Sequence, residues 1–205
     1  MNSQCKKCRR AGQKLFLKGE RCFTPKCSMI KKPYAPGLHG KKRKRALSEY
    51  GSQLAEKQKL KRIYGVNERQ LKKYFKESAK AKGVATEVLL KKLETRLDNV
   101  VFRSGLAESR AKARQIVTHG HIMLNKRRVD IPSIGVKRGD VISIKKSSLT
   151  KALFKGLETK LKKYNFPKWI DFDKKELKAS IIALPSGEEL EAPVDLQMII
   201  EFYSR

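Results

Sequence analysis

All four cysteines of this 205-residue sequence lie close to its N-terminus, in two short pairs. Two residues separate Cys5 from Cys8, and four separate Cys22 from Cys27. Gaps of this size let both sulfurs of a pair reach one tetrahedral ion, and four thiolates are a common ligand set for structural zinc. Residues 1–40 contain few large apolar side chains, so we expect metal binding to supply much of their folding energy.

Three alternatives would use the same cysteines. Two disulfides would need an oxidising compartment, but the first residues lack the apolar stretch of a secretion signal. A redox-active pair is expected in a βαβ context, which the sequence does not predict. An iron–sulfur cluster also takes four thiolates and stays open. We therefore expect these cysteines to bind a metal, with zinc favoured over an iron–sulfur cluster.

The sequence is strongly basic, with 49 Lys and Arg residues against 20 Asp and Glu, which gives a formal net charge of +29. Self-repulsion of this size disfavours a chain that works alone and favours a polyanionic partner. Hydrophobic residues still make up 40% of the sequence, enough to build folded cores. No apolar run reaches the roughly 18 residues of a membrane-spanning helix. Nucleic acid is therefore the first partner to consider.

The charge is unevenly distributed along the sequence. Residues 1–45 contain 15 basic side chains and one acidic side chain, whereas residues 149–205 contain 10 basic and nine acidic ones. This difference predicts that the first three quarters of the chain face nucleic acid and that the end faces a protein neighbour. A solubilising end segment is the alternative, and charge alone does not choose between the two.

Apolar spacing and capping residues predict two helices, then a smaller module of helices and strands. The two helices cover residues 47–64 and 67–82 and end at Gly65 and Gly83. The elements expected after them are an apolar helical face over 90–101, a helix from Ser109 to Gly120, and strands over 121–125, 128–131, 141–144, 177–184 and 189–194. Residues 196–203 have helical apolar spacing, so they must pack on the upstream helices or on a partner.

Two groups of cations are candidates for phosphate contact. The first is the run of five consecutive cations from Lys41 to Arg45. The second group lies on the predicted module and consists of Arg110, Arg114, Lys126, Arg127 and Arg128. His119 and His121 lie on the same edge. No nearby carboxylate or nucleophile completes a catalytic site with them, so nucleic-acid contact or a structural role is favoured over catalysis.

Across essentially its whole length, the sequence carries motifs of one known family. These are Cys5-Lys-Lys-Cys8-Arg-Arg, Lys18-Gly-Glu-Arg-Cys22, Pro36-Gly-Leu-His-Gly40, Gln58-Lys-Leu-Lys-Arg-Ile-Tyr-Gly65, Arg96-Leu-Asp-Asn-Val-Val-Phe-Arg103, Ser109-Arg-Ala-Lys-Ala-Arg-Gln115, His119-Gly-His-Ile122 and Glu201-Phe-Tyr-Ser-Arg205. In this order they resemble bacterial-type ribosomal protein four of the small subunit. The block from about 94 to 148 resembles the RNA-binding domain named after that family.

The resemblance implies an α+β fold in three parts. A metal-stapled N-terminal arm would cover residues 1–42. A small all-helical domain would cover residues 43–91 and be completed by residues 195–205. Inserted between them, residues 92–194 would form an RNA-binding domain of helices packed on a small, mainly antiparallel sheet, with its core motif at 94–148.

The resemblance also implies a structural, non-enzymatic protein of the cytoplasmic ribosome. Such a protein is a primary binder of small-subunit ribosomal RNA, nucleates assembly, lies near the channel through which messenger RNA enters, and affects translational accuracy. Its expected partners are the ribosomal RNA, messenger RNA and small-subunit protein five, with protein three as a further candidate. The alternatives are an RNA-modifying enzyme or a zinc-dependent nucleic-acid-binding regulator that uses the same RNA-binding block.

Charge pattern and resemblance together predict the RNA-binding residues. They are Arg9, Arg10, Lys41, Lys42, Arg43, Lys44, Arg45, Arg62, Arg69, Arg96, Arg103, Arg110, Lys112, Arg114, His119, His121, Lys126, Arg127 and Arg128. Few aromatic residues are arranged as a base-stacking platform, so we expect shape recognition of folded RNA. The sequence departs from the family at the hairpin turn, where Asn125-Lys126 replaces the typical Asn-Gly and Lys tolerates a left-handed conformation poorly.

Overall fold

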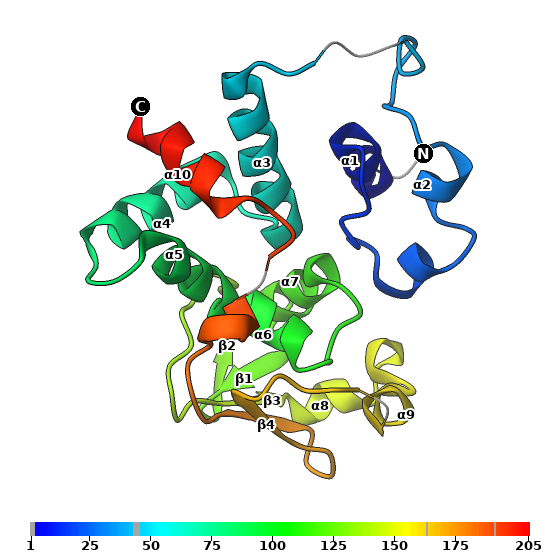
Figure 1. The fold of residues 1–205 in the computed structure, drawn as a ribbon. Helices are drawn as coiled ribbons and strands as arrows, with labels where there is room; N and C mark the ends of the chain where they lie inside the picture. Colours follow the sequence, from blue (N-terminus) through cyan, green and yellow to red (C-terminus); the bar gives the residue numbers. More distant parts are fainter. Residues whose placement is uncertain (1–2, 43–45, 163, 191) are drawn as a thin grey trace. The chain divides into compact units, whose positions relative to one another are not determined.

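The computed structural model describes residues 3–42, 46–162, 164–190 and 192–205. The chain divides into two units, Met1–Leu89 with Ala192–Arg205, and Leu90–Glu191 (Figure 1). The limits of the second unit lie within three residues of those predicted for the inserted domain. Residues 3–42 belong to the first unit rather than to a unit of their own.

The first unit is helical. Its elements are α1 (Ser3–Ala11), the 3-10 turn η1 (Gly19–Phe23), α2 (Ser28–Lys31), α3 (Glu49–Tyr64), α4 (Glu68–Lys80) and α10 (Leu196–Ser204), and α5 (Ala85–Glu94) contains the division between the units. Side chains of Ser48, Asn67 and Asp195 cap α3, α4 and α10 by accepting backbone N–H groups. Gly65 ends α3 with φ +66°, which confirms its predicted role.

The C-terminal helix α10 packs against α3 and α4. The apolar spacing of residues 196–203 predicted either this packing on the upstream helices or packing on a partner. Ile199 is fully buried on this helix. Tyr203 Oη donates to Glu68 Oε1 at 2.8 Å, and Nζ of Lys57 and of Lys61 each lie 2.9 Å from the same carboxylate. Partial burial disfavours ionisation of Glu68, but the hydrogen bonds from Lys57, Lys61 and Tyr203 outweigh it and lower the pKa to about 2.

The second unit is built around a five-stranded antiparallel sheet of order β2-β1-β3-β5-β4. The strands are β1 (Ile122–Leu124), β2 (Arg127–Val129), β3 (Val141–Ile144), β4 (Ile170–Asp173) and β5 (Lys178–Ile181). The helical elements are α6 (Leu97–Arg103), α7 (Arg110–Thr118), α8 (Lys146–Leu149), η2 (Ala152–Phe154), α9 (Leu157–Lys162) and η3 (Gly187–Leu190). A mixed α+β fold with an antiparallel sheet was the sequence prediction.

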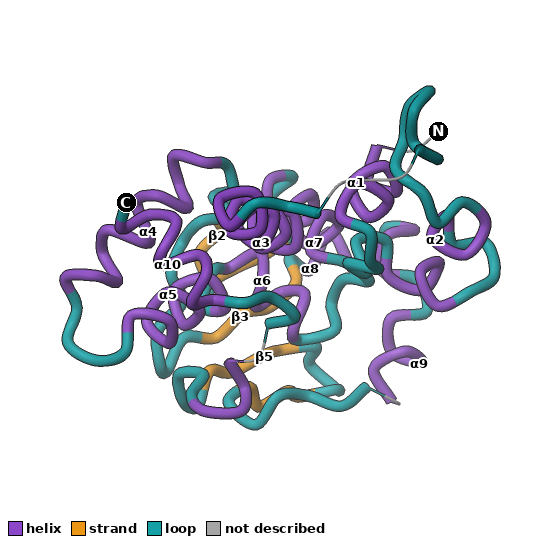
Figure 2. Tube along the Cα trace, turned by 45° about the horizontal axis from the view of Figure 1, so that its top comes forward, coloured by secondary structure: helices purple, strands orange, loops and turns teal. Residues whose placement is uncertain are grey.

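One hydrophobic core joins the sheet of the second unit to α6 and α7, which pack against each other (Figure 2). Its fully buried members include Val100 of α6, Ala113 and Val117 of α7, and Ile122 and Ile142 of the sheet. Apolar residues from both helices and from alternate strand positions thus point to the same interior. In the part of the chain that the structure describes, no helix is long and apolar enough to cross a membrane.

The β1–β2 hairpin turns through Asn125 and Lys126, with φ values of +50° and +66°. Positive φ at both central residues is the pattern of a type I′ turn, whose twist suits a two-residue hairpin. Asn125 stabilises the turn, because its Nδ2 donates to Asp140 at 2.7 Å and its Oδ1 accepts the Val141 N–H at 2.9 Å. Lys126 also has a positive φ, and its side chain, unlike that of Asn, does not favour the left-handed conformation.

Two predictions about secondary structure were wrong. The described residues of the range 189–194 do not form a strand: η3 ends at Leu190, and Pro193 follows soon after, where it cannot donate to a sheet. The partner of β5 is instead β4, at Ile170–Asp173, a segment for which no strand was predicted. The apolar face over 90–101 belongs to two helices rather than one, because Arg96 is extended (ψ 139°) and separates α5 from α6.

Candidate nucleic-acid interface

The four cysteines line one cavity within residues 3–42. They come from three segments: Cys5 and Cys8 from α1, Cys22 from η1, and Cys27 from the residue before α2. All four are free thiols, and only Cys5 is partly exposed. The fold therefore brings together the two pairs that the sequence separates.

The surroundings of Cys8 show how close the thiols are. Burial raises the pKa of the Cys8 thiol, a Leu15 backbone N–H that donates to the sulfur lowers it, and Cys22 and Cys5 raise it again. Yet no three His, Cys, Asp or Glu side chains among the described residues are arranged so that they could hold a metal ion. The structure thus supports a shared thiol cavity, and metal binding stays a prediction.

Arg9, a predicted RNA contact, is tied to the protein itself. It is only 4% exposed, its Nε donates to the Tyr34 carbonyl at 2.8 Å, and its guanidinium carbon lies 4.8 Å from the Tyr34 ring centre. Its neighbour Arg10 is exposed, as are Lys41 and Lys42. Three further predicted contacts lie outside the described residues: Arg43, Lys44 and Arg45.

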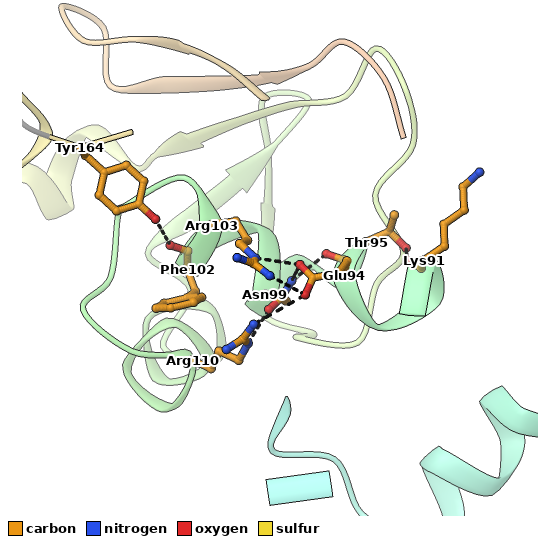
Figure 3. A network of polar contacts seen from close by, with 8 residues as sticks. All are labelled: Lys91, Glu94, Thr95, Asn99, Phe102, Arg103, Arg110 and Tyr164. Carbon is orange, nitrogen blue, oxygen red and sulfur yellow. Dashed lines mark hydrogen bonds and ion pairs between the residues drawn. The ribbon is translucent and has the colours of Figure 1, made fainter. Parts of the chain in front are cut away.

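A buried carboxylate binds two other predicted RNA contacts (Figure 3). The Glu94 side chain is 2% exposed, and Arg103 reaches it with two hydrogen bonds of 2.9 Å. Arg110 Nη2 lies 3.6 Å from the same carboxylate, its Nε donates to Asn99 at 2.6 Å, and its guanidinium covers the Phe102 ring at 4.7 Å. A buried carboxylate needs such partners, so these two arginines compensate Glu94.

A second internal pair holds Arg96, which is 1% exposed. Its Nε and Nη2 donate to the two Asp98 oxygens at 3.0 and 2.7 Å. Arg114 Nη1 lies 3.8 Å from the same carboxylate, but 46% of the Arg114 side chain is exposed. Lys112 lies 3.4 Å from Glu108 and is partly exposed. Arg96 therefore has an internal partner and no exposed guanidinium for a phosphate, whereas Arg114 keeps one.

Several exposed cations of the second unit lie at the β1–β2 hairpin. Lys126, Arg127 and Arg128 are all exposed, and so is His119 beside them at the end of α7. A Cβ at Gly120 would lie 2.3 Å from Arg128 Nε, so glycine is needed there for Arg128 to fold back against the end of the helix. Within the described ranges, no acidic side chain forms an ion pair with these three hairpin cations, so this edge presents positive charge, which suits phosphate binding.

His121 differs from its neighbour His119, because it is only 8% exposed. Its Nδ1 lies 3.0 Å from Ser148 Oγ. Burial lowers its pKa, and nearby cations such as Lys151 lower it further. The structure thus gives His121 a structural hydrogen bond, and its predicted RNA contact stays a prediction.

In the first unit, α4 presents a cationic groove of which the sequence prediction named only Arg69. The groove is lined by Arg69, Lys72, Lys73, Lys76, Glu77 and Lys80. Their helical spacing was visible in the sequence, but a solvated stripe has the same spacing.

Arg62 on α3 is half-buried. Its pKa is lowered mainly by burial and, to a smaller extent, by repulsion from Arg10. Hence Arg62 and Arg10 lie close enough to present joint positive charge.

Comparison with known families covers most of the chain. Residues 1–94 match the model of the ribosomal protein S4/S9 N-terminal domain. Residues 95–142 match the S4 domain, which here comprises α6, α7, the β1–β2 hairpin and the start of β3. The exposed hairpin cations and the two buried arginine–carboxylate networks therefore lie almost entirely within the S4 domain.

Curated relatives match over nearly their whole length. The small ribosomal subunit protein uS4 of Ruminiclostridium cellulolyticum is 48% identical over 204 residues, which cover 100% of this chain and 98% of that protein. The uS4 proteins of Caldicellulosiruptor saccharolyticus and Thermus thermophilus are 51% and 50% identical over 201 residues, covering 98% of this chain and 96% of each relative. This chain therefore belongs to the uS4 family of small-subunit ribosomal proteins.

Proposed function

We propose that this chain is a structural, non-enzymatic component of the small subunit of the cytoplasmic ribosome and binds that subunit's ribosomal RNA. The observation that carries this proposal is the match of the entire chain to uS4 proteins at about 50% identity. The exposed cations on the hairpin and on α4 support it, because phosphate contacts supply most of the affinity of such proteins.

RNA binding would proceed by charge neutralisation on a preformed surface. Each exposed Lys or Arg that meets a phosphate releases condensed counterions, so affinity falls as salt rises. About ten such contacts would give a slope of log affinity against log salt on the order of −7 to −9. The buried pairs around Glu94 and Asp98 would hold α6 and α7 rigid beneath the hairpin, so that little conformational entropy is lost on binding.

We further propose that Cys5, Cys8, Cys22 and Cys27 hold a structural Zn²⁺ ion. Four thiols on one cavity are a donor set that zinc and iron–sulfur clusters share, and among the described residues no His, Asp or Glu lines that cavity. The ion would offset the repulsion among thiolates that Cys22 and Cys5 exert on Cys8. Its role would be to hold the three segments together and present their cations to RNA.

The finer assignments rest on the family resemblance. They are nucleation of subunit assembly, a position near the channel through which messenger RNA enters, an effect on translational accuracy, and contact with messenger RNA and with small-subunit protein five or three. The near-neutral balance of residues 149–205, in a chain that is otherwise strongly basic, supports a protein neighbour for this part of the chain, because neighbouring ribosomal proteins are commonly basic.

Footprinting of the full chain on small-subunit ribosomal RNA tests the proposal. We expect specific protection that persists when duplex DNA competes at the same salt concentration. If competing duplex DNA abolishes the protection, the result would instead support the alternative of a zinc-dependent nucleic-acid-binding regulator. Repeating the footprint after chelation tests the metal: unchanged protection would contradict a docking role for the cysteine segment.

A matched pair of variants tests which cations act. Arg127→Ala removes an exposed cation of the hairpin and should make the salt slope less steep by about one unit. Lys174→Ala removes an equally exposed cation of the same unit from the turn between β4 and β5, in the more acidic part of the sequence, and should leave the slope unchanged. Equal effects of both variants would contradict the assignment of the hairpin edge.

A further inference from the structure

Two phenylalanines beside the cysteine cavity are held at the surface. Phe16 follows α1 and Phe23 ends η1, and their rings stack with centres 5.0 Å apart and planes at 27°. Phe23 is 75% exposed and Phe16 is 47% exposed. Among the described residues, this is the only stacked pair in which both rings are exposed. The rings therefore present an aromatic surface to solvent.

The backbone holds this arrangement at a cost. Phe16 has φ +49°, a left-handed conformation that an aromatic residue rarely adopts. Next to it, Leu15 is 5% exposed, so the local chain buries one apolar side chain while turning its neighbour outward. An exposed ring in a strained conformation is unfavourable in the isolated protein, which indicates that something covers it.

The charges around the rings indicate what covers them. Lys14, Lys18 and Arg21 line the same cavity as Phe16, and Lys26 is exposed three residues after Phe23. In residues 3–42 the only acidic side chain is Glu20. An apolar protein surface would gain nothing from so many cations, whereas a nucleotide combines an aromatic base with an anionic phosphate.

We propose that the Phe16–Phe23 pair is a stacking platform for an unpaired base of the bound RNA, with the flanking cations holding the adjacent phosphates. This inference rests on the proposed RNA-binding function and deepens it, because it adds a base contact to recognition by charge and shape. Phe23, as the more exposed ring, makes the outer contact. Any base offers a π-face to such a ring, so the platform selects an unstacked nucleotide rather than a particular base.

Three substitutions of Phe23 in the full chain test the platform, with small-subunit ribosomal RNA as the probe at one salt concentration. Phe23→Ala and Phe23→Leu should weaken binding on the order of tenfold, because both remove the ring. Phe23→Tyr should bind within about twofold of the parent, because it keeps the ring. The salt slope should not change in any of them, since no charge is removed. Ile30→Ala, an exposed apolar residue of the same segment, is the matched control and should bind like the parent.

Ultraviolet cross-linking supplies an independent readout. We expect the peptide that contains residues 15–26 to carry a nucleotide adduct in the parent and in Phe23→Tyr, and to lose it in Phe23→Leu. If Phe23→Leu binds and cross-links like the parent, or if the adduct is absent throughout, the platform does not exist and an apolar protein contact replaces it. A parent chain without any footprint on the RNA would instead contradict the proposed function.

Discussion

Residues 3–42 and the unit Leu90–Glu191 differ in what lies at their centres. In the second unit, α6, α7 and the sheet enclose a continuous apolar core, so burial of hydrocarbon can stabilise it. In residues 3–42, the buried apolar side chains other than cysteine are Leu15 and Ala35, and the other buried residues are three cysteines, Gly19 and Arg9. One region is thus stabilised by its own apolar side chains, whereas the other has little apolar core, and we expect it to depend on the metal proposed for its thiols.

Removing one thiol should have the largest effect and should be confined to the first of these regions. We expect Cys22→Ser, or chelation of the parent, to leave residues 3–42 unfolded, because few apolar contacts remain to hold them. Limited proteolysis should then cleave this segment, while the second unit keeps its melting temperature. Thr24→Ser, at an exposed position nearby, is the control. Resistance of Cys22→Ser to proteolysis would show that the two regions do not differ in this way.

In the second unit, the largest loss should follow removal of the buried carboxylate. Glu94→Ala removes the buried carboxylate that Arg103 and Arg110 share, and breaking a buried pair costs about 3–5 kcal/mol of unfolding free energy. Denaturant unfolding of the second unit measures this loss. Glu87→Ala, an exposed change on the same helix, should stay within about 0.5 kcal/mol. Similar values for the two variants would mean that the apolar core alone determines this unit's stability.

Acid should loosen α10 before it affects the apolar core. The pKa of Glu68 falls from an ordinary 4.5 to about 2 on folding, so its contribution is complete above about pH 4.5 and is lost as the pH falls toward 2. Hydrogen exchange of the amides around Ile199 should therefore accelerate in that interval. In Glu68→Gln the acceleration should be absent, because no carboxylate remains to titrate. Unchanged acceleration in this variant would assign the effect to other groups.

The smallest expected effect is a gain in the hairpin. Lys126→Gly removes a side chain from a residue with φ +66°, which should raise the unfolding free energy of the second unit by about 1 kcal/mol. The same change removes one exposed cation and should make the salt slope of RNA binding less steep by about one unit. Asn125→Gly is a useful comparison, since it relieves φ +50° but removes the hydrogen bonds to Asp140 and Val141.

Local signals predicted the helices well because the relevant chemistry is local. Ser48, Asn67 and Ser109 cap helices through N–H groups only three residues further on, and Gly65 ends α3 on its own. Strand β4 was missed because it is only four residues long and contains two aspartates, which are uncommon in strands, although Ile170 and Phe172 alternate with them. Its antiparallel register with β5, which follows across a short turn, makes Ile170–Asp173 a strand.

The candidate interface was predicted less completely, because residue type does not reveal which side a cation faces. Arg96 and Arg127 look alike in the sequence, yet one is bound to Asp98 in the interior and the other is exposed. The stacked rings of Phe16 and Phe23 depend on the path of the chain around the cysteines, for which the sequence offers no periodic signal.

The packing of α10 on α3 has a consequence for the order in which the newly made chain can fold. Synthesis reaches α10 only after the whole of Leu90–Glu191 has been made. The second unit can therefore complete its core while α3 and α4 still lack a partner and Glu68 still lacks Tyr203. During this interval, the apolar faces of α3 and α4 are open to chaperones and to aggregation, and arrival of α10 ends that exposure.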